Sequence, residues 1–509
     1  MTLFTSRSLA VPRKAAILAA LFVTATATVE AGTFKKAAEE KAVAGEYMVV
    51  LKEHAAKLSI KPERTDLPTA ATVGRRLEKR YGVTVVKVWD RALPGLLIRA
   101  TDEAAQRLAD DPRIEAVEQN ATFPFENEES APAGSCYGLD SYPYGSLFYR
   151  TPPAASPQSI NCSDSDPTHD TGGNGQPPLC QDNWGLDRID QHAAARDALY
   201  TYTRTGSVPG QVNVRIFLLD SGVNATHREF LNSQGTASRA FGIDVTGDTS
   251  CAPTTDPIGH GTHVAGIAAG RTFGVAKDAT IVVVRASNCR GITFTSWIVD
   301  ALNAVAGQRP SVLNWSGGND QTIIGTTAIR TAVQGVVNSG VMVVQAAGNQ
   351  SSPYPLPGWS PAVYPTGVED ACSWTFGNIP GVLVVGGTDQ NNNRWTRIMS
   401  GDLVQSFCPP DCGSNVGSCI DVWAPAANIL SAGRYDMYGY CRLSGTSMAA
   451  PHAAGVAALY LQAHPLASAT EVEAAIVASA TTGLLNTNAQ TPNQIGPTSF
   501  NRLLYSQVP

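Results

Sequence analysis

Short apolar runs alternate with amphipathic segments over the second half of the chain, from about residue 183 to residue 505. The runs are rich in Val, Ile and Leu, and each is bounded by Gly, Asn or Asp. Continuous apolar strands separated by helices are typical of a parallel sheet that is covered on both faces. We expect strands at residues 214–219, 280–284, 311–313, 341–346 and 382–385, and helices that include residues 296–305 and 329–338.

Residues 45–123 carry a different pattern, that of a smaller α/β unit. Their apolar and polar positions predict the order β-α-β-β-α-β, which is the split βαβ arrangement of ferredoxin-like folds. The expected strands are residues 47–52, 83–89, 96–100 and 114–119, and the expected helices are residues 70–81 and 102–109.

Residues 125–180 separate the small unit from the larger domain, which we place at residues 181–509. The separating segment is rich in Pro, Gly, Ser and Asp and contains Cys136, Cys162 and Cys180. An unpatterned run of this length is uncommon inside a compact domain, so we expect a linker or an extension pinned by disulfides. Three cysteines cannot all pair with one another, so at least one bonds elsewhere. Attachment to a substrate or wall and an inert spacer both fit the composition.

The first 31 residues have the parts of a secretory signal. Arg7, Arg13 and Lys14 precede an apolar run at residues 15–23, and small residues follow it. The run is about half as long as a membrane-spanning helix requires, so a membrane anchor is not expected. The sequence therefore predicts a secreted, extracellular protein.

The composition narrows the class of protein further. A length of 509 residues favours two or more domains, and 43% hydrophobic residues exclude wholesale disorder. The 37 basic and 43 acidic residues give a net charge of −6, so nucleic acid is not an expected partner. Ten cysteines, an even number, favour an oxidising compartment and structural disulfides of open connectivity. A zinc knuckle at Cys408, Cys412 and Cys419 is the less favoured alternative, because no histidine lies close by.

Three segments carry candidate chemistry, each at the end of an apolar element. Asp220 follows a buried strand, His260 lies in a glycine-lined bend that enters a helix, and Ser447 opens a long apolar helix ending near residue 462. A serine hydroxyl needs an imidazole to take its proton, and the imidazole needs a carboxylate to orient it. Asp, His and Ser in this chain order form one known version of the catalytic triad. A helix N-terminus at the serine adds N–H groups for a developing oxyanion.

Each of these residues also has an ordinary structural explanation. Asp220 alone fits a turn at a strand end, His260 alone a hydrogen-bonded structural histidine, and Ser447 alone a helix N-cap. The three segments together, each in its glycine-rich setting, favour the triad.

With these motifs the chain closely resembles the subtilisin-like serine proteases, or subtilases, and among them the proteinase K branch. The resemblance covers residues 184–504, and residues 45–124 separately resemble the inhibitory propeptide of these enzymes. It implies a parallel-sheet catalytic domain with helices on both faces, preceded by a ferredoxin-like propeptide. Asp220 would orient the imidazole, His260 would act as general base and acid, and Ser447 would attack the scissile carbonyl. His263 matches a structural position, and Val264 stands where the proteinase K branch has cysteine.

The resemblance also implies residues that bind the substrate. Asn349, which follows a buried strand and Gly348, corresponds to an amide that donates to the oxyanion. Two further segments correspond to strands that pair with an extended peptide, and Gly317 stands where relatives have leucine, so the pocket there should be more open and cleavage broad. The segments are Gly291, Ile292 and Thr293, and Ser316, Gly317 and Gly318.

No cofactor is expected for the chemistry, but a structural calcium ion is. Asp421, with the carbonyls of Pro380 and Val382, matches a calcium site of the family, and oxygen ligands suit this cation. An aspartate satisfied by N–H groups in a turn is the alternative. Sequons lie at Asn120, Asn161, Asn224 and Asn349, and the last two are too close to the predicted site for a glycan to be expected.

Together these features predict a secreted, monomeric serine endopeptidase that acts on proteins and peptides. It would be made as a zymogen, cut itself soon after Phe123 or, alternatively, nearer Cys180, and be inhibited by its own propeptide. An inactive protease scaffold with a binding role is the alternative, and the presence of all four predicted catalytic residues disfavours it.

Overall fold

The structure is a computed structural model. It describes residues 31–61, 66–124, 184–197, 200–208, 212–232, 234–252, 254–317, 325–351, 369–397, 412–434, 437, 439–488, 494–496 and 498–509. The predicted signal, the cysteine-containing extension, Asn161, Gly318 and Cys408 lie outside these residues.

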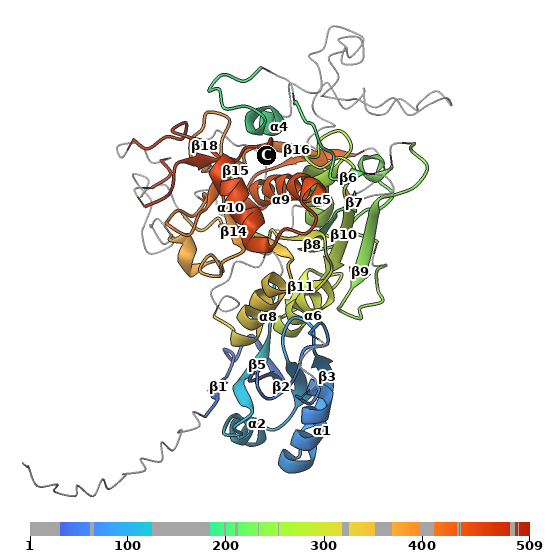
Figure 1. The fold of residues 1–509 in the computed structure, drawn as a ribbon. Helices are drawn as coiled ribbons and strands as arrows, with labels where there is room; N and C mark the ends of the chain where they lie inside the picture. The colour runs from blue at the N-terminus through green and yellow to red at the C-terminus, as the bar shows by residue number, and fades with distance from the viewer. Residues whose placement is uncertain are drawn as a thin grey trace, which may run out of the picture.

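The N-terminal unit has the predicted ferredoxin-like arrangement (Figure 1). Its strands follow the order β1-β5-β2-β4-β3, and the four longer strands pair antiparallel. Both predicted helices have the expected bounds, whereas β1, which pairs parallel to β5, was not expected. The elements are β1 (Thr33–Lys35), β2 (Ala42–Leu51), α1 (Ala70–Tyr81), β3 (Thr84–Trp89), β4 (Gly95–Arg99), α2 (Asp102–Ala109) and β5 (Ile114–Pro124).

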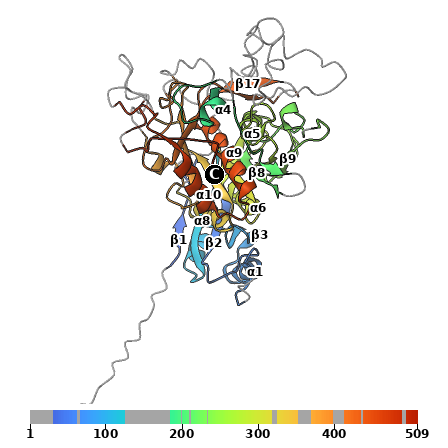
Figure 2. The same cartoon turned by 45° about the horizontal axis from the view of Figure 1, so that its top comes forward.

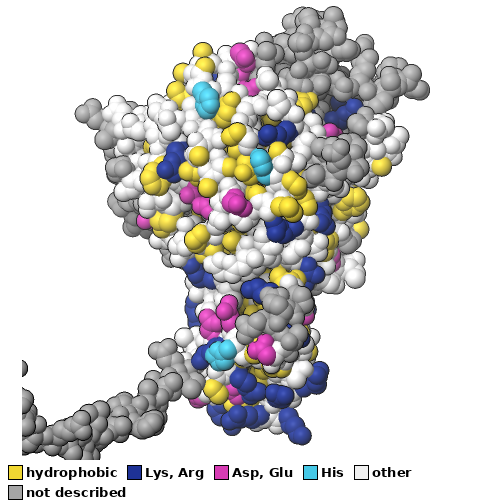
Figure 3. Space-filling view, viewed as in Figure 1, with side chains coloured by type: hydrophobic (Ala, Val, Ile, Leu, Met, Phe, Trp, Pro, Cys, Tyr) yellow, Lys and Arg dark blue, Asp and Glu magenta, His cyan; other side chains and the backbone are white. Residues whose placement is uncertain are grey.

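Helix α1 shows why this segment folds as predicted. The Thr69 side chain accepts a hydrogen bond from the Thr72 N–H and caps its start, and Gly82 ends it with a φ of 70°. Val73 and Leu77 lie in the core of the unit. The exposed basic side chains of α1 form much of the dark blue surface at the far end of the unit in Figure 3.

A nine-stranded sheet forms the centre of the larger domain, with the order β18-β19-β15-β14-β13-β12-β8-β10-β9. All its neighbouring strands pair parallel except β18 and β19. The five strands expected from the sequence are the interior strands β8, β10, β12, β13 and β14. The sheet comprises β8 (Arg215–Asp220), β9 (Ala240–Asp244), β10 (Thr280–Arg285), β12 (Ser311–Trp315), β13 (Met342–Ala346), β14 (Val382–Thr388), β15 (Val422–Pro425), β18 (Thr481–Thr482) and β19 (Arg502–Leu503).

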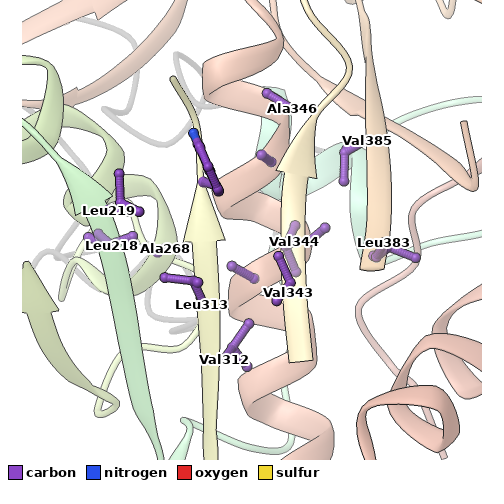
Figure 4. Packing of buried hydrophobic residues seen from close by; sticks show 14 of the residues in the cluster. Leu218, Leu219, Ala268, Val312, Leu313, Val343, Val344, Ala346, Leu383 and Val385 are labelled. Atoms are coloured by element: carbon purple, nitrogen blue, oxygen red, sulfur yellow. The ribbon is translucent and has the colours of Figure 1, made fainter. Parts of the chain in front are cut away.

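Helices cover this sheet, as the continuous apolar strands predicted. Every residue of β12, β13 and β14 is buried, and because successive side chains point to opposite faces, both faces must be covered. One pair of helices is α5 (His260–Ala269) with α9 (Thr446–Ala463), and another is α6 (Thr295–Val305) with α8 (Thr327–Asn338). Figure 4 shows the aliphatic side chains of the strands meeting α9.

Shorter elements complete the described part of the domain. They are α4 (Trp184–Ile189), β6 (Ser207–Val208), β7 (Val212–Asn213), η3 (Arg228–Phe230), β11 (Ile292–Phe294), η4 (Ala371–Ser373), β16 (Ile429–Ala432), β17 (Tyr440–Leu443) and α10 (Ala469–Ser479). Within the described residues, no helix is both long and apolar enough to cross a membrane.

The N-terminal unit docks on α6 and α8, below the larger domain in Figures 1 and 2. The Asp300 carboxylate accepts hydrogen bonds from the Lys87 ammonium at 2.6 Å and from the Trp89 indole at 2.7 Å. The Asn303 side-chain oxygen accepts three successive backbone N–H groups, those of residues 90–92, at 2.8–3.3 Å. These polar contacts lie beside apolar residues of both units that share one core.

Strand β5 supplies side-chain caps for both helices. The Glu118 carboxylate accepts the N–H groups of Thr327 and Ala328 at 2.8 and 3.0 Å, at the start of α8. The Asn120 oxygen accepts the Ser296 N–H at 3.1 Å, at the start of α6. Both caps satisfy N–H groups that a helix start leaves without a partner. Asn120 is 1% exposed, so its sequon is closed to a glycan in this state.

Two disulfides are described in full, Cys251–Cys289 and Cys372–Cys419. Cys412 is disulfide-bonded as well. The disulfides at Cys412 and Cys419 rule out the zinc alternative for this group.

The fit between Ala92 and α8 can be tested by substitution. A Cβ atom on Gly335 would lie 1.6 Å from the Ala92 carbonyl oxygen. We expect Gly335→Ala to loosen the N-terminal unit while stabilising α8 itself by up to about 1 kcal/mol, because alanine is the better helix former. Hydrogen exchange of the full chain should show faster exchange at residues 90–92. Gln334→Ala, which adds no atom towards Ala92, is the control, and equal exchange in both variants would contradict the close fit.

Candidate active site

Three predicted site residues follow neighbouring strands of the large sheet. Asp220 ends β8, Ser316 comes directly after β12, and Asn349 lies three residues beyond β13. These strands are parallel and adjacent, with Trp315 of β12 opposite Leu219 of β8. Their carboxyl ends therefore meet at one edge of the sheet, where reactive groups gather in open α/β folds.

Asp220 and His260 form a buried hydrogen-bonded pair. The His260 Nδ1 atom lies 2.9 Å from Asp220 Oδ1 and 3.2 Å from Oδ2. Asp220 is 0% exposed and His260 is 2% exposed. The Ser221 N–H donates to Asp220 Oδ1 at 2.8 Å. Because a carboxylate only accepts hydrogen bonds, the Nδ1 atom carries the proton and Nε2 of neutral His260 is the basic nitrogen.

Two glycines allow the strand end and the helix to approach this closely. A Cβ atom on Gly261, the second residue of α5, would lie 2.2 Å from the Gly222 carbonyl oxygen. Gly222 itself has a φ of 135°, and a Cβ atom there would lie 2.2 Å from the Thr255 oxygen. Side chains at either position would push His260 away from Asp220, which explains the glycines of both motifs.

Ser447 is the second residue of α9, which begins at Thr446, one residue earlier than expected. Its hydroxyl donates to the Ser316 carbonyl at 2.5 Å, and the Ser316 hydroxyl donates to the Ser447 carbonyl at 3.0 Å. The Ser447 carbonyl can accept this bond because Pro451, four residues on, has no N–H to donate. Asn314 in turn donates to the Ser316 hydroxyl at 2.8 Å. Ser316 therefore holds the serine at both its side chain and its backbone.

The Asn349 side chain is oriented by its neighbour in the helix. Its Oδ1 atom accepts the Thr446 N–H at 2.9 Å and the Thr446 hydroxyl at 2.8 Å. Because these bonds fix the side-chain oxygen, the amide nitrogen points the other way and is available as a donor. It lies beside Gly445, where an added Cβ atom would be 3.2 Å from it. Strand β13 and helix α9 thus place an N–H donor next to Ser447.

The first predicted peptide-binding segment is already paired with a strand. Thr293 and Ile292 of β11 lie opposite Phe123 and Pro124 of β5 in antiparallel register. Gly291 precedes this strand with a φ of 78°. Of the second segment, Ser316 and Gly317 lie at the end of β12, and Gly318 is outside the described residues.

Two further histidines are structural. His263 is 0% exposed, and its Nε2 atom lies 3.1 Å from the Ile429 oxygen and 3.0 Å from the Cys441 oxygen. Burial lowers the pKa of His263 to about 3 and that of His452 to about 4. Both imidazoles are neutral at neutral pH.

Asp421 lies directly before β15 and beside β14. Its carboxylate accepts the Val384 N–H at 2.8 Å, a backbone donor as in the alternative to a calcium site, but one that belongs to strand β14 and not to a turn. Burial raises the pKa of Asp421 to about 7, and the nearby Glu473 carboxylate adds to the increase. Glu473 itself accepts the Gly381 N–H at 2.6 Å, between Pro380 and Val382. No cluster of three or more His, Cys, Asp or Glu side chains suited to a metal occurs among the residues that the structure describes.

Sequence reasoning missed two groups at this site. Ser316 was expected to contribute only its backbone, and Asp256, in the histidine motif, was given no role. For Ser316 the available signal was a polar residue at the end of a buried strand, and for Asp256 it was an acidic residue a few positions before a predicted catalytic residue.

The chain belongs to the subtilase family, which residues 211–497 match. It is 32% identical over 476 residues to alkaline serine exoprotease A of Vibrio alginolyticus, an alignment that covers 93% of this chain and 70% of that protein. It is 30% identical over 471 residues to the extracellular serine proteinase of a Thermus species, covering 90% of this chain and 91% of that protein. A cold-adapted subtilisin-like serine proteinase of known crystal structure is 34% identical, covers 64% of this chain and 97% of its own, and has a TM-score of 0.48. The protein is thus a serine protease that hydrolyses peptide bonds and needs no cofactor for catalysis.

The neutral state of His263 should make the stability of the protein depend on pH. An unfolded histidine binds its proton near pH 6.5, whereas folded His263 does so only near pH 3. Between these values the unfolded state binds more protons, so the free energy of unfolding falls as the pH falls below about 6.5. We expect His263→Gln to reduce this loss by about 1–3 kcal/mol between pH 6.5 and 4.5. Urea unfolding with an irreversible serine protease inhibitor present measures it, and an unchanged pH dependence would show that His263 does not stay neutral.

Proposed function

We propose that Asp220, His260 and Ser447 are the catalytic triad of this protease. The buried Asp220–His260 hydrogen bond is the observation that supports this most strongly, because it fixes the tautomer with a basic Nε2 atom. The Ser447 hydroxyl donates to the Ser316 carbonyl in the resting site, so the mechanism requires a rotation about its Cα–Cβ bond that turns it to the imidazole. His260 takes the hydroxyl proton as Ser447 attacks the scissile carbonyl, and it returns the proton to the leaving amine. Water then hydrolyses the acyl-enzyme with His260 again as the base.

The developing oxyanion would be bound by the Asn349 amide and by N–H groups at the start of α9. The Thr446 contacts hold Asn349 Oδ1, which leaves its amide hydrogens for the substrate. A donor placed in advance costs no reorganisation during the reaction. Loss of one such donor in subtilisin, itself a subtilase, lowers turnover about a hundred- to a thousandfold, and we expect an effect of that size here.

We further propose that residues 45–124 are the inhibitory propeptide and that the protease is a secreted zymogen that cuts itself. Strand β5 pairs with β11 as an extended substrate would, and it therefore occupies one of the two segments proposed to pair with the substrate. Main-chain pairing of this kind accepts many sequences, in keeping with broad cleavage of protein substrates through residues 291–293 and 316–318. Export agrees with the charged and apolar N-terminus and with the disulfides.

Self-cleavage can be tested with Ser447→Ala. We expect this variant to accumulate as a full-length precursor without its signal, because the attacking hydroxyl is missing. Immunoblotting and intact mass of the secreted protein measure the product. Ser444→Ala, which removes a neighbouring hydroxyl, is the control and should mature normally. Normal maturation of Ser447→Ala would mean that another protease makes the cut.

We also propose a structural calcium ion at Asp421 with the carbonyls of Pro380 and Val382. The donor set fits: Asp421 and Glu473 are half-buried carboxylates whose mutual repulsion a divalent cation would relieve. The ion would stiffen the fold and take no part in the chemistry.

Chelation tests this site. We expect removal of calcium to lower the Tm of the inhibited enzyme by several degrees, corresponding to about 1–3 kcal/mol. Asp421→Asn should lower the Tm in calcium and make it insensitive to the chelator. Equal sensitivity of the variant and the wild type would place the ion elsewhere.

A further inference from the structure

Asp256 is a buried carboxylate beside the proposed triad, and it has no role in the mechanism proposed above. It is 7% exposed and lies in the loop that leads from β9 into α5, four residues before His260. Its Oδ1 atom accepts the Gly259 N–H at 2.7 Å and the Ser221 hydroxyl at 2.8 Å. Its Oδ2 atom accepts both the N–H and the hydroxyl of Thr262 at 2.7 Å. The Ile258 N–H adds a longer contact to Oδ1 at 3.2 Å. Every one of these partners is a donor and favours the ionised carboxylate, whereas burial raises the pKa of Asp256.

Two of these donors connect Asp256 to the strand end that carries Asp220. The Ser221 hydroxyl donates to Asp256 and accepts the Gly261 N–H at 3.0 Å. The Thr262 hydroxyl donates to Asp256 and accepts the Asn224 N–H at 2.9 Å. The Ser221 hydroxyl, which follows β8, thus binds an N–H group of the helix, and the Thr262 hydroxyl, in the helix, binds an N–H group of the segment after β8. Both meet at the same carboxylate.

Helix α5 is capped at its start by Asp256 and by Ser221, whose hydroxyl accepts the Gly261 N–H at 3.0 Å. Its N-cap residue is Gly259, with a φ of 100° and no side chain to accept a hydrogen bond. Asp256 accepts the N–H of Thr262, the third residue of the helix, and places a negative charge at the positive end of the helix dipole. The first residue of this helix is His260, so whatever fixes the helix start also fixes the imidazole.

We propose that Asp256 is a positioning residue of this protease. Through Ser221 and Thr262 it holds the start of α5 against the end of β8 and keeps the imidazole of His260 on the carboxylate of Asp220. The proposal rests on the triad proposed above. Asparagine cannot replace Asp256, because a carboxamide has one oxygen. Whichever way it is turned, its N–H₂ group faces the N–H of Gly259 or that of Thr262.

Steady-state kinetics of the secreted, processed enzyme on an extended chromogenic peptide tests this role. We expect Asp256→Asn to lower kcat about 10- to 100-fold, since a small displacement of a catalytic group has an effect of that size. KM should change less than about twofold, because Asp256 contacts neither β11 nor Ser316 in any bond described above.

The matched control is Glu229→Gln, at the opposite end of α5. Glu229 is 1% exposed and accepts the N–H groups of Thr272 and Phe273 at 2.7 and 3.2 Å. Glu229→Gln therefore disturbs hydrogen bonds of the same kind as Asp256→Asn does. We expect it to lower the Tm much as Asp256→Asn does and to leave kcat unchanged. An equal loss of kcat in both variants, or none in Asp256→Asn, would overturn the proposal.

A second variant keeps the carboxylate and removes both hydroxyl bridges. Ser221→Ala with Thr262→Val should fold, retain the buried charge and lower kcat with KM unchanged; full kcat in this variant would also overturn the proposal. The downfield proton resonance of the His260 imidazole should broaden or shift in both Asp256→Asn and this double variant, and stay in place in Glu229→Gln. Ser447→Ala tests the triad independently: activity of its secreted form, whether precursor or processed, would refute the proposed function, whatever Asp256→Asn shows.

Discussion

The buried hydrogen bond between Asp220 and His260 sets the strictest requirement on this structure. A carboxylate that is removed from water must be satisfied by donors, and here the imidazole and the Ser221 N–H supply them. The bond can form only if a strand end and a helix start nearly touch. The two glycines at positions 222 and 261 provide that approach, and neither position has room for a Cβ atom. The glycines in the motifs around Asp220 and His260 are therefore explained by the short distance between these two side chains.

Ser447 and Asn349 are also held in place by hydrogen bonds to neighbouring residues. Pro451 leaves the Ser447 carbonyl without its helical partner, and the hydroxyl of Ser316 takes that place. Thr446 fixes Asn349 in the same way through two bonds. A helix start, a strand end and a turn are thus joined by side chains that do not react. These supporting bonds determine where the proposed nucleophile, Ser447, and the proposed amide donor, Asn349, lie.

Much of this arrangement could be predicted from the sequence. The interior strands and α1 and α2 have strong periodicity or continuous apolar runs, and they lie within a few residues of their expected positions. Strand β5 was expected to end at Gln119 and extends to Pro124, because its last residues pair with β11, more than 160 residues away. Pairing between distant segments leaves little trace in local pattern. For the same reason Asp256 looked like an ordinary loop residue, since the Ser221 hydroxyl that binds it comes from a strand end far away in the sequence.

The central claim is that Asp220, His260 and Ser447 act as one unit. Covalent modification by a phosphonofluoridate, followed by peptide mass mapping and by the rate of labelling, tests it most directly. The account predicts a single label on Ser447 in the wild type and labelling slowed at least about a thousandfold in folded His260→Ala. A label on another residue, or equally fast labelling of Ser447 without the imidazole, would contradict it.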